Sequence, residues 1–178
     1  MQIISKTKKM ILSALLLTLS IVLSRFLSIK TPILSITFNF VPIMLSAIWL
    51  GPKYTCVISG LSDLIGAVLF PFGEFFIGFT ISSITMGLIY GLILYKRECE
   101  FTKKGLIVRL IIAIVIETIV VQTILNTLWL VIMYNKAFFV LLSTRIIKEI
   151  IMIPIQVITM FVLIQALKPI TKKYLEER

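Results

Sequence analysis

Long apolar segments follow one another along this chain, and only short polar segments separate them. Of its 178 residues, 59% are hydrophobic and 15% are charged, and the mean hydropathy is +1.09. So few charged residues cannot cover the surface of a soluble domain of this length. A spanning helix needs roughly 20 apolar residues, so the chain has room for about six of them with very short loops. The sequence therefore predicts a single all-α integral membrane domain over residues 1–178.

Turn-forming residues and breaks in the apolar pattern divide the chain into the expected helices. We place these transmembrane helices at about residues 9–27, 40–50, 54–69, 75–94, 106–133 and 138–167. Residues 28–39 contain Pro32 and scattered hydroxyl groups, which is typical of a loop or a re-entrant segment. The first apolar run is longer than that of a signal peptide and lacks a small-residue cleavage site, so we expect a retained helix.

Basic residues indicate the orientation of the bundle. They cluster between apolar segments instead of along one soluble face, so the net charge of +10 does not point to nucleic acid. The expected outer segments carry only Arg25, Lys30 and Lys136. The expected inner segments carry Lys6, Lys8, Lys9, Lys53, Lys96, Arg97, Lys103, Lys104, Lys168, Lys172, Lys173 and Arg178. By the positive-inside rule, both the N and C termini are expected to be cytoplasmic.

Three ionisable residues interrupt the last apolar run, within the segment TRIIKEIIMIPIQ. At helical spacing Arg145, Glu149, Met152 and Gln156 share one face, and Lys148 lies on its flank. A charge at membrane depth costs several kcal/mol unless it faces protein or water, so we expect this face to point inward. Arg145 and Glu149 could neutralise each other as an i,i+4 pair. That pairing would leave Lys148 unpaired, which favours a site that receives an anion.

Polar residues in other expected helices offer further ligand contacts. Asp63 is a lone acid among small residues in SGLSDLIGA, and its carboxylate can accept paired N–H donors or cap a neighbouring polar group. Gln122, Asn126 and Trp129 recur at i, i+4 and i+7 on one face, where the amides either contact a ligand or join helices. Glu117 lies deep in the same helix, and the sequence does not identify its partner.

Several of these candidates share the outer side of the expected bundle. Phe72 and Phe76 are placed there to stack on a planar ligand, although aromatic residues also form belts at the membrane interface. The other candidates at that depth are Arg25, Asn39, Asn126, Trp129, Arg145 and Lys148. The sequence therefore predicts an outward-opening pocket suited to a planar heterocycle with an anionic tail.

Motifs for enzymatic chemistry are missing. The sequence has no GxxxxGK[ST], no HExxH, no GxSxG and no histidine. Cys56 falls in an expected helix and Cys99 in an expected cytoplasmic loop, so neither a disulfide nor a metal site is indicated. We expect a binding subunit that uses no cofactor. The alternatives are a small membrane enzyme of lipid metabolism and an assembly subunit.

Six segments together carry a resemblance to a known family: LSRFLSI, FNFVPIMLSAIWLGP, SGLSDLIGA, FPFGEFF, LNTLWL and TRIIKEIIMIPIQ. Over nearly its whole length the chain resembles the folate-specific S components of energy-coupling factor (ECF) vitamin transporters. The resemblance implies the S-component fold, a place in the bacterial cytoplasmic membrane and folate held near the outer face. It also implies a transmembrane coupling protein and two cytoplasmic ATPases as partners, and release of the vitamin inside when the S component topples.

The resemblance also implies roles for single residues. The AxxxA surface by which the family docks on its coupling protein corresponds to Ala14 and Thr18, where threonine departs from the motif but stays small. Candidates for the pterin ring of folate are Asn39, Asp63, Asn126, Phe76 and Trp129. Candidates for its dianionic glutamate tail are Arg145, Lys148 and Arg25. Riboflavin, pantothenate or thiamine on the same scaffold are the alternative ligands, and the cationic last helix argues against thiamine.

Overall fold

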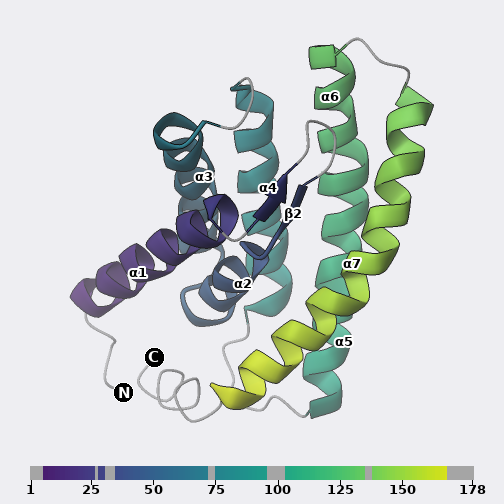
Figure 1. Cartoon of the computed structure of the whole chain (residues 1–178). Helices are drawn as coiled ribbons and strands as arrows, with labels where there is room; N and C mark the ends of the chain where they lie inside the picture. The colour runs from purple at the N-terminus through teal and green to yellow at the C-terminus, as the bar shows by residue number, and fades with distance from the viewer. Residues whose placement is uncertain are drawn as a thin grey trace.

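The computed structural model describes residues 6–26, 28–30, 35–71, 75–95, 103–134 and 138–167. The described chain is helical apart from one small hairpin (Figure 1). Its elements are α1 (Lys6–Arg25), β1 (Ser28–Lys30), β2 (Ser35–Thr37), α2 (Phe40–Trp49), α3 (Pro52–Leu69), α4 (Ile77–Leu94), α5 (Lys103–Glu117), η1 (Thr118–Leu125), α6 (Asn126–Tyr134) and α7 (Phe138–Ala166). Because α5, η1 and α6 run on as one rod, the described residues form six helical rods, as predicted.

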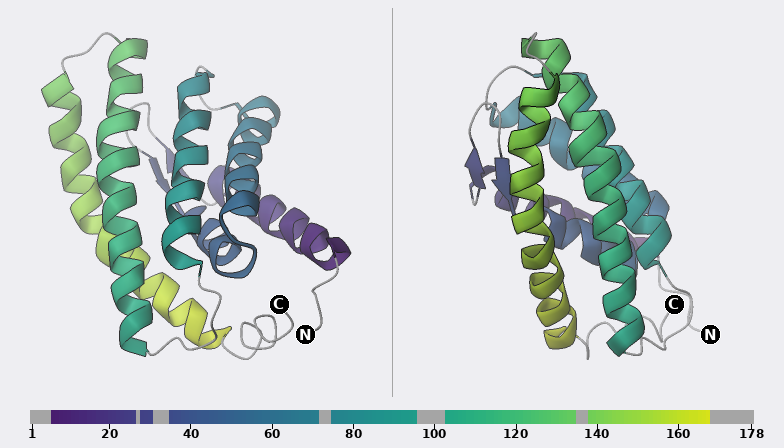
Figure 2. Two further views of the ribbon diagram at one scale, coloured as in Figure 1. Left: turned by 180° about the vertical axis from the view of Figure 1, so that it is seen from behind. Right: turned by 90° about the vertical axis from the view of Figure 1, so that its right-hand side faces the viewer.

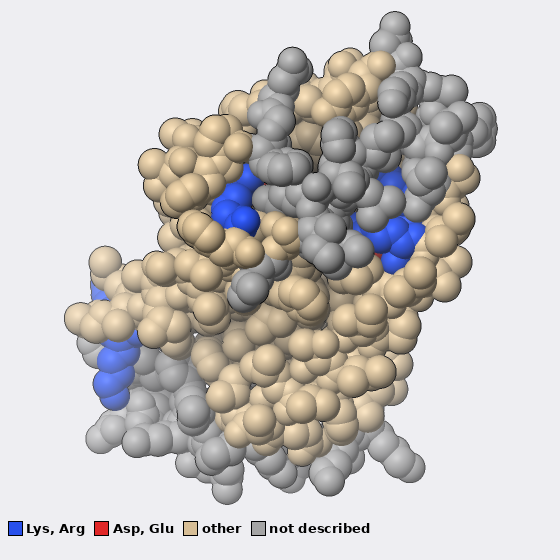
Figure 3. Space-filling view, viewed as in Figure 1, with Lys and Arg blue, Asp and Glu red and all other residues tan. Residues whose placement is uncertain are grey.

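Four helical stretches are long and apolar enough to cross a membrane. They are Lys6–Arg25, Ile77–Leu94, Gly105–Tyr134 and Arg145–Ala166. Their outward faces carry large apolar side chains, and Figure 3 shows few charged atoms among the described residues on the face it draws. Apolar side chains on the outside fit a molecule whose solvent is lipid.

α2 forms the centre of the bundle. It has 10 residues and is therefore about 15 Å long, half the thickness of a bilayer core. All of its residues are buried, and it packs against α1, α3, α4 and α7. A helix that is apolar all round must be covered on every side, which explains its place. It ends at Gly51, whose φ of 86° favours glycine, and a Cβ there would lie 2.5 Å from the Tyr95 ring.

The segment between α1 and α2 contains a β-hairpin that the sequence analysis did not predict. β1 and β2 pair antiparallel, with Ser28 opposite Thr37 and Lys30 opposite Ser35. The expectation of a loop or re-entrant segment missed these strands because each is only 3 residues long. The hairpin lies on one face of the bundle, beside α7 in the right-hand view of Figure 2.

The helices α5 and α7 both depart from regular straight geometry. A π-helix, η1, interrupts the rod that the sequence analysis predicted as one uniform helix over residues 106–133. α7 contains Pro154 and changes direction along its length in Figure 1, as the predicted proline kink requires. These two irregular helices pack against each other and supply most of the polar residues described next.

Candidate functional site

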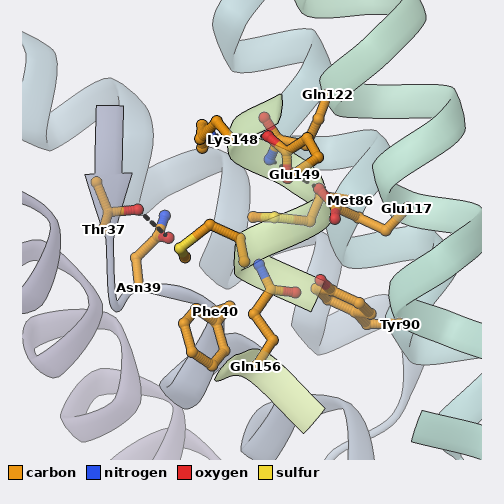
Figure 4. Close-up of a pocket in the computed structure, with 11 residues that line it drawn as sticks. Thr37, Asn39, Phe40, Met86, Tyr90, Glu117, Gln122, Lys148, Glu149 and Gln156 are labelled. Carbon is orange, nitrogen blue, oxygen red and sulfur yellow. Dashed lines mark hydrogen bonds and ion pairs between the residues drawn. The ribbon is translucent and has the colours of Figure 1, made fainter. Parts of the chain in front are cut away.

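A pocket, with about 380 Å³ of empty space that includes open solvent, lies between the hairpin and the irregular helices (Figure 4). α7 contributes four of its lining residues, and β2, the turn after it, α2, α4, α5 and η1 contribute the others. The lining residues are Thr37, Asn39, Phe40, Met86, Tyr90, Glu117, Gln122, Lys148, Glu149, Met152 and Gln156. Segments far apart in the sequence thus meet around one space with both apolar and polar walls.

The inward face of α7 agrees with the prediction. Arg145, Glu149, Met152 and Gln156 are between 4% and 9% exposed. Lys148 on the flank is not unpaired, however, because its Nζ lies 2.8 Å from Glu149 Oε1. The expectation of a lone lysine was wrong, since the sequence analysis considered only the i,i+4 pair of Glu149 with Arg145. Lys148 still lines the pocket. Its ammonium group has three N–H donors, so Lys148 can donate to a ligand while it keeps its ion pair with Glu149.

Arg145 is directed to η1. In a regular α-helix the amide of Asn126 would donate to the carbonyl of Gln122, but here it donates to the carbonyl of Val121. The Gln122 carbonyl therefore loses its usual helical donor, and Arg145 Nη1 donates to it at 2.9 Å. The guanidinium thus compensates for the irregular backbone, and Arg145 is not among the residues that line the pocket.

A relay of amide hydrogen bonds runs along α5, η1 and α6. Gln122 Nε2 donates to Glu117 Oε1 at 2.9 Å, and Asn126 Nδ2 donates to Gln122 Oε1 at 3.1 Å. Gln122 is therefore a partner of Glu117 that the sequence could not identify. Glu117 and Gln122 line the pocket, whereas Asn126 lies behind them. Gln122 and Asn126 lie next to each other, as their i,i+4 spacing predicts. Their hydrogen bonds link α5, η1 and α6, and Gln122 also lines the pocket.

Trp129 belongs to a different cluster. Its Nε1 donates to Ser82 Oγ at 3.0 Å, and its ring centroid lies 5.6 Å from that of Phe76. Neither Phe76 nor Trp129 is among the residues that line the pocket. The two aromatic candidates therefore lie together but beside the pocket, and the third, Phe72, lies outside the described residues.

Arg25 and Asp63 meet at the junction of α1, α3 and α4. Arg25 donates through Nη1 to the Phe70 carbonyl at 3.3 Å and through Nη2 to the Asp63 carbonyl at 3.4 Å. Thr80 Oγ1 donates to Asp63 Oδ2 at 2.9 Å. Of the two alternatives for Asp63, the structure shows the carboxylate bonded to a neighbouring polar group. Both residues lie apart from the pocket lining.

Two of the predicted ligand-binding residues, Asn39 and Lys148, thus lie in the pocket wall. The wall residues that were not predicted as ligand contacts are Thr37, Phe40, Met86, Tyr90, Glu117, Glu149, Met152 and Gln156, whereas Gln122 was predicted either to contact a ligand or to join helices. Sequence signals existed for the polar ones on α7, which share the face of Arg145. Met86 and Tyr90 resemble ordinary core residues at i,i+4 spacing, so nothing in the sequence marked them.

The surface of α1 is open at the predicted docking positions. Ala14 and Thr18 are exposed, and Thr18 Oγ1 donates to the Ala14 carbonyl at 2.9 Å, which leaves a small surface without a free hydroxyl proton. Met10, Ile11 and Leu15 around them are between 58% and 67% exposed.

Among the described residues no group of three or more His, Cys, Asp or Glu side chains could hold a metal ion.

Comparison with known proteins identifies the family. Residues 8–164 match the model of the ECF transporter, substrate-specific component. The chain is 40% identical over 156 residues to "Folate transporter FolT" of Clostridium novyi (strain NT), covering 88% of this chain and 87% of that protein. It is 36% identical over 174 residues to "Folate transporter FolT" of Leuconostoc mesenteroides subsp. mesenteroides, covering 94% and 91%.

A solved structure gives the same result. The fold matches a crystal structure of FolT bound with folic acid at a TM-score of 0.79 and 35% identity, covering 88% of this chain and 92% of that one. The chain therefore belongs to the substrate-specific components of ECF transporters, which are multi-pass membrane proteins and not enzymes.

Proposed function

We propose that this chain captures folate from the outer side of a bacterial cytoplasmic membrane for ATP-driven uptake. The observation that carries the proposal is its similarity, at 40% and 36% identity over most of the chain, to two proteins named as folate transporters. The solved structure that it matches contains folic acid. The pocket supports the same ligand, because it combines apolar walls, hydrogen-bonding groups and a lysine.

The pocket favours a division of roles along α7. Lys148 and Gln156 are eight residues apart, which corresponds to about 12 Å along the helix axis. Lys148 lies toward the α6–α7 connection, the expected outer end, and binds the anionic glutamate tail. The ring then lies deeper, between Phe40 and Met86, with Asn39 over it from the hairpin side.

The other predicted ligand residues act indirectly in this proposal. Arg145 and Asn126 hold η1 and Gln122 in place. Phe76 and Trp129 form an aromatic pair outside the pocket lining. Arg25 and Asp63 join α1 to α3, and Phe72 keeps its predicted role as a stacking residue.

Uptake requires partners that hydrolyse ATP, because this chain has no phosphate-binding loop. We infer that a transmembrane coupling protein docks on α1 at Ala14 and Thr18, with two cytoplasmic ATPases below it, and that toppling releases the vitamin. The exposed, small and apolar surface of α1 supports this docking. Co-purification with a coupling protein that survived Thr18→Leu unchanged would contradict it.

Tryptophan fluorescence of the detergent-purified chain tests the ligand. Trp49 lies at the opposite end of α2 from Phe40, a residue of the pocket wall, and Trp129 follows three residues after Asn126, the first donor of the relay to Glu117. We expect saturable quenching by folate and none by thiamine or riboflavin. Saturation with a different vitamin would retain the transporter family and replace the ligand. Silence with every vitamin, from a monodisperse preparation, would favour an assembly subunit.

A further inference from the structure

A carboxylate oxygen of Glu117 in the pocket has no hydrogen-bond partner among the described residues. The Glu117 side chain is 1% exposed and lines the pocket. Its Oε1 accepts the Gln122 hydrogen bond, whereas its Oε2 makes no hydrogen bond with any residue that the structure describes. A buried carboxylate oxygen without a donor is unfavourable. Its position on a pocket wall therefore points to a ligand that supplies the donor.

The nearby cations are directed elsewhere. The Lys148 ammonium pairs with Glu149 at 2.8 Å, and the Arg145 guanidinium donates to the Gln122 carbonyl at 2.9 Å. Glu149 thus has a cationic partner, whereas the hydrogen-bonding neighbours of the Glu117 carboxylate are neutral: the Gln122 amide and the Tyr90 hydroxyl. Both carboxylates have an oxygen without a hydrogen-bond partner among the described residues, but only that of Glu149 lies at ion-pair distance from a cation, so we infer that Glu117 is the carboxylate left for N–H donors of a ligand.

The surroundings of Glu117 suit a flat ring with hydrogen-bonding edges. Gln156, 6% exposed, has an Oε1 atom without a partner among the described residues, and it lines the same pocket. Phe40 and Met86 supply apolar surface, and Figure 4 draws them around the same space as Gln156 and Tyr90. Apolar faces with acceptors at the rim match a heterocycle whose edge carries N–H groups.

We propose that Glu117 is the residue that determines specificity for the ring of the ligand, by accepting hydrogen bonds from two adjacent N–H donors. This inference rests on the proposed function, because the pterin of folate carries a ring N–H next to its 2-amino group. One donor meets Oε2, and the other meets the remaining lone pair of Oε1. Gln122 is a positioning residue in this arrangement, since its amide fixes the carboxylate from behind.

The proposal is tested by measuring the affinities of two chains, unaltered and Glu117→Gln, for two ligands, folic acid and an analogue. Glu117→Gln keeps the size of the side chain but places an amide where two acceptors were. Hydrogen bonds to a charged group are strong, so we expect the substitution to weaken folic acid binding ~10-fold to several hundredfold. An analogue of folic acid without the 2-amino group should bind the unaltered chain at least ~10-fold more weakly than folic acid, and Glu117→Gln should discriminate between the two less than ~3-fold.

Two controls separate recognition of the ring from other effects. p-Aminobenzoyl-glutamate lacks the pterin, so its affinity should be the same for the unaltered chain and Glu117→Gln. Asp63→Asn changes a carboxylate outside the pocket lining, which has Thr80 as its partner, and should retain discrimination against the analogue. Glu117→Asp keeps the charge and should retain part of the discrimination, which covers the case in which Glu117→Gln fails to fold.

The outcomes distinguish the two proposals. If the unaltered chain does not bind folic acid, the proposed function fails. If it binds folic acid but tolerates loss of the 2-amino group, or if Glu117→Gln discriminates as well as the unaltered chain, only the assignment of Glu117 is overturned. Equal weakening of p-aminobenzoyl-glutamate and folic acid by Glu117→Gln would also overturn it, because the defect would then be a general one.

Discussion

Two polar clusters lie within this apolar molecule, and they differ in what their polar groups face. In the α1–α3–α4 cluster, Arg25, Asp63 and Thr80 form hydrogen bonds that run from one helix to another. In the pocket cluster, Glu117 and Gln156 line a space and have oxygen atoms without partners among the described residues. Both clusters contain charged residues that the sequence analysis treated alike.

The difference teaches that a charge inside a membrane protein does not identify a ligand contact by itself. An intramembrane charge must meet a partner, and that partner can be another helix as readily as a substrate. What separates the clusters is the cavity: Arg25 Nε also lacks a partner among the described residues, but Arg25 does not line the pocket, whereas Glu117 and Gln156 do. The comparison can be tested by substitutions that affect stability and folate affinity to different degrees.

The largest effect is expected from Arg145, which lies behind the pocket. Arg145→Met removes the charged donor to the part-buried Gln122 carbonyl, at a cost of about 1–3 kcal/mol. Because Gln122 holds Glu117, we expect folate affinity to fall ~100-fold together with thermal stability. Calorimetry and thermal unfolding in detergent measure both quantities. Normal stability with strongly reduced affinity would instead indicate that Arg145 contacts the glutamate tail directly.

A smaller effect on affinity is expected from the ion pair of Lys148 and Glu149. Lys148→Met alone leaves a buried carboxylate unpaired, which destabilises by about 3–5 kcal/mol. Combining it with Glu149→Gln should restore stability, because a neutral pair needs no counter-charge. Folate affinity should nevertheless remain ~10-fold reduced, and binding of a pterin without a glutamate tail should be unchanged. Full recovery of folate affinity in the double variant would contradict anchoring by Lys148.

The smallest effect on affinity is expected in the α1–α3–α4 cluster. Asp63→Asn weakens the hydrogen bond from Thr80, so unfolding should become easier by about 1–2 kcal/mol. Because Asp63 lies outside the pocket lining, folate affinity should change less than ~3-fold. Thermal unfolding and a folate titration on one preparation measure the stability and the folate affinity of this variant. A large loss of affinity at unchanged stability would show that the two clusters do not differ as the structure suggests.

The sequence predicted the fold well, for a simple physical reason. Lipid-exposed backbone must form helices, so apolar length and turn residues place them, and the observed ends of α2 and α4 lie within two residues of those predicted. The hairpin and η1 were missed. Short strands have weak periodicity, and a π-helix depends on a donor such as Arg145, which comes from another helix.

The candidate site was predicted only in part, and the residues show why. Lys148 and Asn39 were recognisable as polar residues in apolar surroundings, and both line the pocket. Asp63 carried the same signal but lies in the other cluster. Met86 carried no signal, because its role depends on which helix faces α4 and not on its own chemistry.

The sequence by itself determined that this is a membrane protein of six helices, with charges on the inward face of the last one. Those properties follow from local composition and helical periodicity, which each segment carries alone. Only the tertiary structure decided that Lys148 pairs with Glu149, that Arg145 supports η1 and that Glu117 lines the pocket with an oxygen that no described residue hydrogen-bonds. Hydrogen-bond partners on different helices depend on how the helices rotate and pack, and a single segment does not encode that.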